Sequence, residues 1–148
     1  MPIDVTATAR KQLISAAALQ RVATCELERA IYRASEAGLS SRQISDIATL
    51  SQPAVQRIVR RFTEDPSLQR PSPGEIIDRA AAGLIGRSEM MAQLLDRQYA
   101  AGHAARLGGV ATDAYLRSDW DDVELAYYRG LLNADEFQRL AERHVRDG

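Results

Sequence analysis

Apolar residues recur at three- and four-residue spacing through residues 37–62, AGLSSRQISDIATLSQPAVQRIVRRF, and this period predicts two short amphipathic helices. The first helix is expected to begin at Ser40 or Ser41, because a serine hydroxyl accepts a hydrogen bond from an unpaired backbone N–H at a helix start. Its expected inward face consists of Ile44, Ile47 and Ala48.

Thr49 and Leu50 are expected to form a tight turn between the two helices. Ser51 is the N-cap candidate of the second helix, and Pro53 falls in its first turn, where a missing N–H costs little. The second helix would bury Val55, Ile58 and Val59. Its outward side would then present Gln52, Gln56, Arg57, Arg60 and Arg61.

The preceding segment, residues 8–37, contains neither proline nor glycine and favours helix throughout. Gly38 ends it as a C-cap glycine, whereas Thr24 can cap a fresh helix, so the segment is either one long helix or two. Apolar residues of its first half need a further packing partner. A second copy of the chain and the C-terminal half of the same chain are equal alternatives for Leu13, Ala17 and Leu19.

Prolines cluster in residues 66–73 and predict a linker between a region at 1–65 and a region at 74–148. Residues 99–117 have no clear period and contain glycines, so a long loop or a poorly ordered helix extension is expected there. The predicted fold class is all-α. Helix starts in the second region are expected at Ser72, Ser88, Ser118 and Asn133.

Composition agrees with an all-helical chain, since apolar residues make up 45% and aromatic residues 5% of 148 residues. The net charge of −1 conceals an asymmetry: residues 1–71 carry ten basic and seven acidic side chains, and residues 72–148 carry nine and thirteen. A basic half that holds the two-helix pair and an acidic half suggest two separate functions. The alternative is that both surfaces are simply solvated.

No arrangement of residues typical of an enzyme is found. Cys25 has no second cysteine and no neighbouring histidine, so neither a disulfide nor a cysteine nucleophile is expected. His103 and His144 are too few for a histidine-based metal site, and no phosphate-binding glycine motif is present. The sequence therefore predicts no catalysis, no cofactor and no metal. An acidic cluster is expected to complement the dipole of a helix N-terminus: Asp119, Asp121, Asp122 and Glu124.

Residues 1–12 lack the apolar centre of a signal peptide, and no run approaches the roughly twenty apolar residues of a membrane span. A cytoplasmic location without membrane partners is therefore expected.

The two-helix pair resembles the helix-turn-helix of bacterial DNA-binding regulators. The matching positions are Gly38-Leu39-Ser40, the small Ser45 where the helices approach, Leu50-Ser51 after the turn, and the pair Val55 and Ile58. One position departs from the pattern, because many members of the class have glycine where this chain has Thr49. A β-branched residue there is strained by roughly 1 kcal/mol if its φ is positive. The alternative is an ordinary helical hairpin with a solvated basic face.

The resemblance implies that the second helix enters the major groove of double-stranded DNA. Gln52 and Gln56 share one helix face, and glutamine can pair with adenine through two hydrogen bonds. One such unit contacts few base pairs, so a homodimer on a two-fold operator is expected. Arg57 and Arg60 would reach guanine or phosphate, and Arg61 and Arg42 would contact phosphate. The expected DNA-binding residues are Arg42, Ser51, Gln52, Pro53, Gln56, Arg57, Arg60 and Arg61.

The segments GEIIDRAAAGLIGRSEMM and SDWDDVELAYYRGLLNADEF are similar to actinobacterial antitoxins of toxin–antitoxin operons. That resemblance implies a repressor that autoregulates its operon through the N-terminal half and neutralises a partner toxin through the C-terminal half. One alternative is a stand-alone repressor whose C-terminal half dimerises or senses a ligand, and another is an interaction module that does not bind DNA. Trp120 suits an interface anchor, with core packing as its alternative. The expected partner-binding residues are His103, Arg106, Tyr115 and Trp120.

Overall fold

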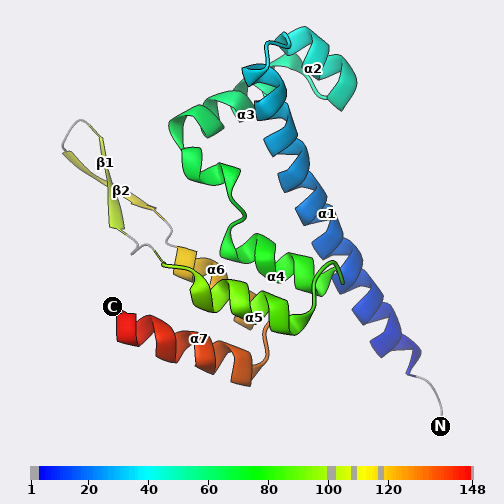
Figure 1. Cartoon of the computed structure of the whole chain (residues 1–148), viewed down its shortest axis with the longest axis vertical. Helices are drawn as coiled ribbons and strands as arrows, with labels where there is room; N and C mark the ends of the chain where they lie inside the picture. The colour runs from blue at the N-terminus through cyan, green and yellow to red at the C-terminus, as the bar shows by residue number, and fades with distance from the viewer. Residues whose placement is uncertain (1–3, 100–102, 108–109, 117–118, 148) are drawn as a thin grey trace.

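The computed structural model describes residues 4–99, 103–107, 110–116 and 119–147 of the chain. The fold is all-α, as predicted, with one added β-hairpin (Figure 1). The elements in chain order are α1 (Val5–Glu36), α2 (Ser41–Ala48), α3 (Gln52–Glu64), a 3₁₀ turn (Pro66–Gln69), α4 (Pro73–Ala81), α5 (Arg87–Asp96), β1 (His103–Leu107), β2 (Val110–Leu116), α6 (Asp119–Tyr128) and α7 (Ala134–Asp147).

A single helix of 32 residues, α1, runs through the molecule and decides between the two alternatives for residues 8–37. Asp4 caps its start by accepting a hydrogen bond from the Ala7 N–H, and Gly38, with φ of 104°, follows its end. Positive φ is a conformation that glycine adopts without steric cost. In Figure 1, α2 and α3 lie at the C-terminal end of α1, and α4 crosses nearer its middle.

A small core joins α1 to α2 and α3 through the buried residues Ile31, Ile44 and Val55. Ile47 was predicted to face inward, and this is wrong, because its side chain is 75% exposed. The inward side of α2 is centred on Ile44 and Ala48, and Ile47 lies about 100° of rotation from Ala48 on the outer side.

A larger core lies among α4, α5, α6 and α7 and includes the fully buried Ile77, Met90, Leu94 and Val123. The predicted caps hold this unit together. Ser72 accepts a hydrogen bond from the Glu75 N–H at the start of α4, as predicted from the sequence. Ahead of α7, Asn133 and Glu136 cap each other's backbone N–H groups at 3.0 and 2.8 Å. α5 begins at Arg87, one residue before the predicted Ser88.

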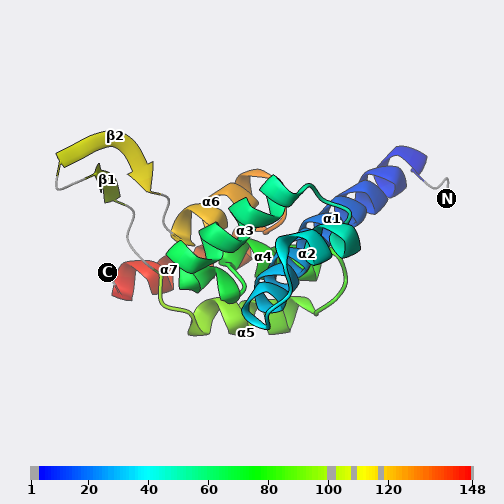
Figure 2. The same cartoon turned by 90° about the horizontal axis from the view of Figure 1, so that it is seen from above.

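The segment 99–117 was predicted as a loop or helix extension, whereas the structure contains an antiparallel hairpin of β1 and β2. The register of the hairpin shifts between Ala104 and Arg106. Val110, Thr112 and Tyr115 favour extended backbone, which explains strand formation in a segment without helical periodicity. Both views show the hairpin standing apart from the helices (Figures 1 and 2).

α1 packs against both predicted regions of the chain: its middle contacts α4 of the second region, and its C-terminal end contacts α2 and α3 of the first. Ala18 and Val22 are buried on the α4 side, at 0% and 1% exposure. Leu13 and Leu19 are 70% and 48% exposed, so the C-terminal half leaves these leucines largely uncovered. The predicted linker contains the 3₁₀ turn, and its last residue, Pro73, is already the first of α4.

Candidate nucleic-acid interface

The candidate interface is the pair α2 and α3, and both helix starts follow the predicted capping chemistry. Ser40 accepts a hydrogen bond from the Gln43 N–H at 3.2 Å, while the Gln43 side chain accepts one from the Ser40 N–H at 2.9 Å. Ser51 accepts a hydrogen bond from the Ala54 N–H at 3.2 Å, and Pro53 lies in the first turn of α3. These local bonds fix where each helix begins and therefore which side of α3 faces outward.

The turn between the helices is held by Ser45. Its hydroxyl donates a hydrogen bond to the Leu50 carbonyl, and its carbonyl accepts one from the Leu50 N–H at 3.3 Å. Thr49 sits between them in the left-handed region, with φ of 58° and ψ of 44°. At the position where many helix-turn-helix proteins have glycine, this chain therefore places a β-branched residue in a backbone conformation that glycine prefers.

Replacing Thr49 with glycine is expected to raise the free energy of unfolding by about 1 kcal/mol, because the left-handed strain disappears and the exposed side chain loses no buried contact. Thr63→Gly is the comparison variant, since Thr63 is also an exposed threonine but lies in the last turn of α3, where its hydroxyl donates to the Val59 carbonyl at 2.9 Å. Glycine there should lower the stability by about 0.5 kcal/mol. Chemical denaturation of both variants measures the difference; equal destabilisation would contradict the strain at Thr49.

The outward side of α3 is polar and basic. Val55 and Phe62 are buried at 0% and 3%, so the opposite side of the helix is solvent-exposed. Every residue predicted to contact DNA is exposed, and all but one lie on α3 or at its N-cap; Arg42 lies on α2. The exposed set is Arg42, Ser51, Gln52, Pro53, Gln56, Arg57, Arg60 and Arg61.

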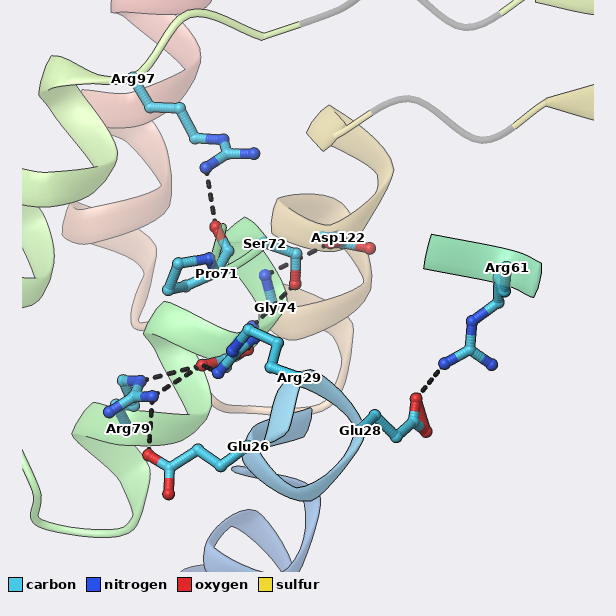
Figure 3. A network of polar contacts seen from close by, with 11 residues as sticks. Glu26, Glu28, Arg29, Arg61, Pro71, Ser72, Gly74, Arg79, Arg97 and Asp122 are labelled. Atoms are coloured by element: carbon cyan, nitrogen blue, oxygen red, sulfur yellow. Dashed lines mark hydrogen bonds and ion pairs between the residues drawn. The ribbon is translucent and has the colours of Figure 1, made fainter. Parts of the chain in front are cut away.

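Arg61 differs from the other arginines of this surface, because it forms an ion pair with Glu28 of α1 (Figure 3). Its guanidinium also lies 5.9 Å from the centre of the Phe62 ring, which stacks on Tyr32 of α1 at 5.3 Å. Arg61 therefore helps attach α3 to α1. Within the described part of the chain, Arg42, Arg57 and Arg60 form no such ion pair. Nothing in the sequence pairs Glu28 with Arg61, which lie 33 positions apart.

The predicted partner-binding residues are not brought together by described contacts. His103, Arg106 and Tyr115 lie on the hairpin, and their side chains are outside the described part of the structure. Trp120 packs within the chain: it stacks on His144 at 4.2 Å and lies 6.0 Å from the Phe137 ring. Its Nε1–H donates to Glu124 at 2.9 Å. These contacts agree with core packing of Trp120, the alternative to its role as an interface anchor.

The acidic cluster at α6 is occupied by contacts within the protein. Asp119 pairs with Arg97 at 3.0 Å, and Asp122 accepts a hydrogen bond from the Gly74 N–H at the start of α4. Asp122 also approaches Gly74 so closely that a Cβ there would lie 3.3 Å from its Oδ2. These carboxylates connect α6 to the neighbouring segments.

The alternative in which the C-terminal half senses a ligand requires a place for that ligand. An open groove of about 520 Å³ lies between α1, α4 and α6. Its charged lining includes Arg21 and Asp78, which pair with each other at 2.8 Å. Cys25 also lines the groove, and burial raises the pKa of its thiol, with the Glu75 carboxylate adding to the effect. A thiol held protonated in this way is a poor nucleophile.

Comparison with known proteins identifies no family for this chain: no protein-family model matches it, and neither a curated protein nor a solved structure matches significantly. Across its described residues, the chain contains no helix with the length and apolar character needed to cross a membrane.

Proposed function

We propose that this chain is a sequence-specific DNA-binding protein that represses transcription, with α3 as the helix that enters the major groove. The observation that carries the proposal is the arrangement of α3: a serine cap and a tight turn fix it against α2, its apolar side is buried, and its outward side is polar and basic. An N-terminal part of a helix can reach base edges when the helix lies in the major groove.

The residues have distinct roles in this proposal. Gln52 and Gln56 lie one turn apart near the start of α3 and would contact base edges, where a glutamine amide matches the donor and acceptor of adenine. Arg57 would contact guanine or phosphate, whereas Arg60, two turns beyond the start of α3, and Arg42 would contact phosphate. Arg61 contributes less than the sequence alone suggests, because binding phosphate would cost its ion pair with Glu28.

Gln56→Ala is expected to weaken binding to the cognate site by about 1–3 kcal/mol and to relax the base preference at one position. Arg60→Ala should instead weaken all sequences alike and reduce the salt dependence of binding. Fluorescence anisotropy with duplexes from upstream of the gene and with scrambled duplexes, at several salt concentrations, separates the two effects.

Gln69→Ala is the matched control for this experiment, because Gln69 is exposed on the 3₁₀ turn beyond α3. It should bind as the unchanged chain does. Wild-type binding by both Gln56→Ala and Arg60→Ala would refute the assignment of α3, and no binding to any duplex would refute the DNA function.

The partner of the C-terminal half stays a prediction from the sequence resemblance. A toxin-like reading frame directly adjacent to this gene, with a product that co-purifies with the chain, would support the antitoxin function over a stand-alone repressor. The helices α4, α5, α6 and α7 form the unit on which such a partner would bind.

A further inference from the structure

One side of α1 presents an uncovered apolar face. Residues along it are spaced alternately four and three apart, the spacing of a helix that packs lengthwise against another helix. All are exposed, with Leu13 at 70% and Leu27 at 42%. None is charged. The face consists of Ala9, Leu13, Ala16, Gln20, Ala23 and Leu27.

The centre of this face lies opposite the part of the molecule that packs on α1, and of its six residues Gln20 also borders the groove between α1, α4 and α6. With 3.6 residues per turn, its six positions are centred about 180° from Ala18, Val22, Cys25 and Arg29, which face α4. The C-terminal half of the same chain therefore cannot cover it without unpacking α4. Leu19, 48% exposed, adds apolar surface along its edge.

We propose that a second copy of this chain occupies the face, with the two α1 helices antiparallel around a two-fold axis. The order of residues favours this orientation. If Ala9 lies opposite Leu27 of the second copy, then Leu13 lies opposite its Ala23 and Ala16 opposite its Gln20. Each of these pairs thus combines a large side chain with an alanine, so the distance between the two helix axes can stay the same along the whole interface. A parallel pair would place leucine on leucine and alanine on alanine, which leaves layers of unequal thickness.

The antiparallel register also has a consequence for the two α3 helices. α3 contacts α1 at Glu28 and Tyr32. In this register each Glu28 lies about 30 Å from its counterpart along the helix axis and each Tyr32 about 42 Å, from a rise of 1.5 Å per residue. These values bracket the 34–36 Å that separates half-sites one turn of DNA apart.

The two-fold axis of an antiparallel pair is perpendicular to both helices, so a segment on one flank of α1 lies on the same flank in the second copy. Glu28 and Tyr32 lie on one flank of the apolar face, about 100–140° around the helix from it. Both α3 helices are therefore on the same side of the pair, as a two-fold operator requires. This part of the argument rests on the proposed DNA function; the pairing itself does not.

The area of the face predicts a weak dimer. A strip about 27 Å long and one helix diameter wide covers roughly 300 Å² on each copy. Each partner of a typical stable complex buries about 800 Å². We therefore expect reversible association at high protein concentration without DNA, and tighter association when two adjacent half-sites hold both copies.

Sedimentation equilibrium of the full chain without DNA, from low-micromolar to near-millimolar concentration, tests the association. Ala16→Arg should weaken dimerisation at least about tenfold, because it places a long charged side chain in the closest part of the interface. Ala7→Arg is the matched control: Ala7 is exposed on α1 but lies outside the apolar face. Both variants should keep the helical content and thermal stability of the unchanged chain. A monomer at every concentration, or a dimer that Ala16→Arg does not weaken, would overturn the proposal.

Thiol crosslinking tests the orientation in a Cys25→Ser background. Gln20→Cys places the two thiols about 6 Å apart along the axis and should crosslink readily, whereas Leu27→Cys places them about 27 Å apart and should not. A parallel pair would crosslink at both positions, and that result would overturn the antiparallel arrangement. Because no step uses DNA, failure here is distinguishable from failure of the DNA function.

Discussion

Glu75→Ala is expected to lower the free energy of unfolding by about 3–5 kcal/mol, the cost of leaving a buried charge without its partner. Arg29 and Glu75 are only 8% and 4% exposed. They share two parallel hydrogen bonds, each 2.7 Å long, between α1 and α4. Removal of the carboxylate strands the Arg29 guanidinium in this buried position, because Glu75 is its ion-pair partner there.

Glu26→Ala is the matched control, since Glu26 belongs to the same network but its side chain is 56% exposed. Its carboxylate is largely solvated and Arg79 keeps its ion pair with Glu75, so the loss of Glu26 should cost less than about 1 kcal/mol. Urea denaturation of both variants measures the contrast. Similar losses of unfolding free energy for Glu75→Ala and Glu26→Ala would show that the burial of Glu75 does not increase its contribution to stability.

The same pair gives the stability a defined pH dependence. Burial by itself would raise the pKa of Glu75, but the hydrogen bonds from Arg29 and Arg79 outweigh it and hold that pKa below the ordinary value. The stabilisation is therefore present above the unfolded-state pKa of about 4.3 and is lost as the pH falls towards the lower folded-state pKa. Glu75→Gln should lack this contribution, so its stability should change less than that of the unchanged chain between neutral and acidic pH.

Cleavage of the chain within residues 66–73, at an engineered protease site, is expected to leave the two pieces associated. The junction between α1 and α4 holds them through the buried Ala18 and Val22 and through three sets of ion pairs, Arg21–Asp78, Arg29–Glu75 and Arg79–Glu26. Size-exclusion chromatography of the cleaved protein should give a single complex. Separate elution of the pieces would show that the junction is too weak to join the two cores.

A fragment that ends at Arg70 should be far less stable than the cleaved complex. It keeps the small core of Ile31, Ile44 and Val55 but loses the cover of Ala18 and Val22, and a chain of that size is marginal by itself. Circular dichroism should show a melting temperature well below that of the cleaved complex. Equal melting of fragment and complex would contradict this dependence on α4.

Local signals in the sequence predict most of the α2 and α3 unit, because capping is decided within a few residues. Ser51 and Pro53 mark the start of α3 correctly, and Thr49 is identified as an unusual turn residue before its φ is known. The same local reasoning places Ile47 wrongly, since an eight-residue helix is compatible with more than one inward side and the position of α1 selects between them.

Contacts between distant residues could not be predicted in this way. Arg29 and Glu75 lie 46 positions apart, and a single sequence offers no sign that they meet. The proline-rich segment marks a boundary between helices, but the buried pair attaches α1 to α4, so α1 packs against both of the regions that this segment separates. The hairpin was missed for a different reason, because glycines and weak periodicity indicate the absence of a helix without indicating what replaces it.

The stacking of Trp120 on His144 has a practical consequence for spectroscopy. Trp120 is the single tryptophan of the chain, and it is partly buried and packs against the core formed by α4, α5, α6 and α7. Intrinsic tryptophan emission therefore reports on that core alone, while far-ultraviolet ellipticity is dominated by the long α1 and the other helices. Coincident unfolding transitions by the two signals would therefore show that the α2 and α3 unit unfolds together with the core of α4, α5, α6 and α7.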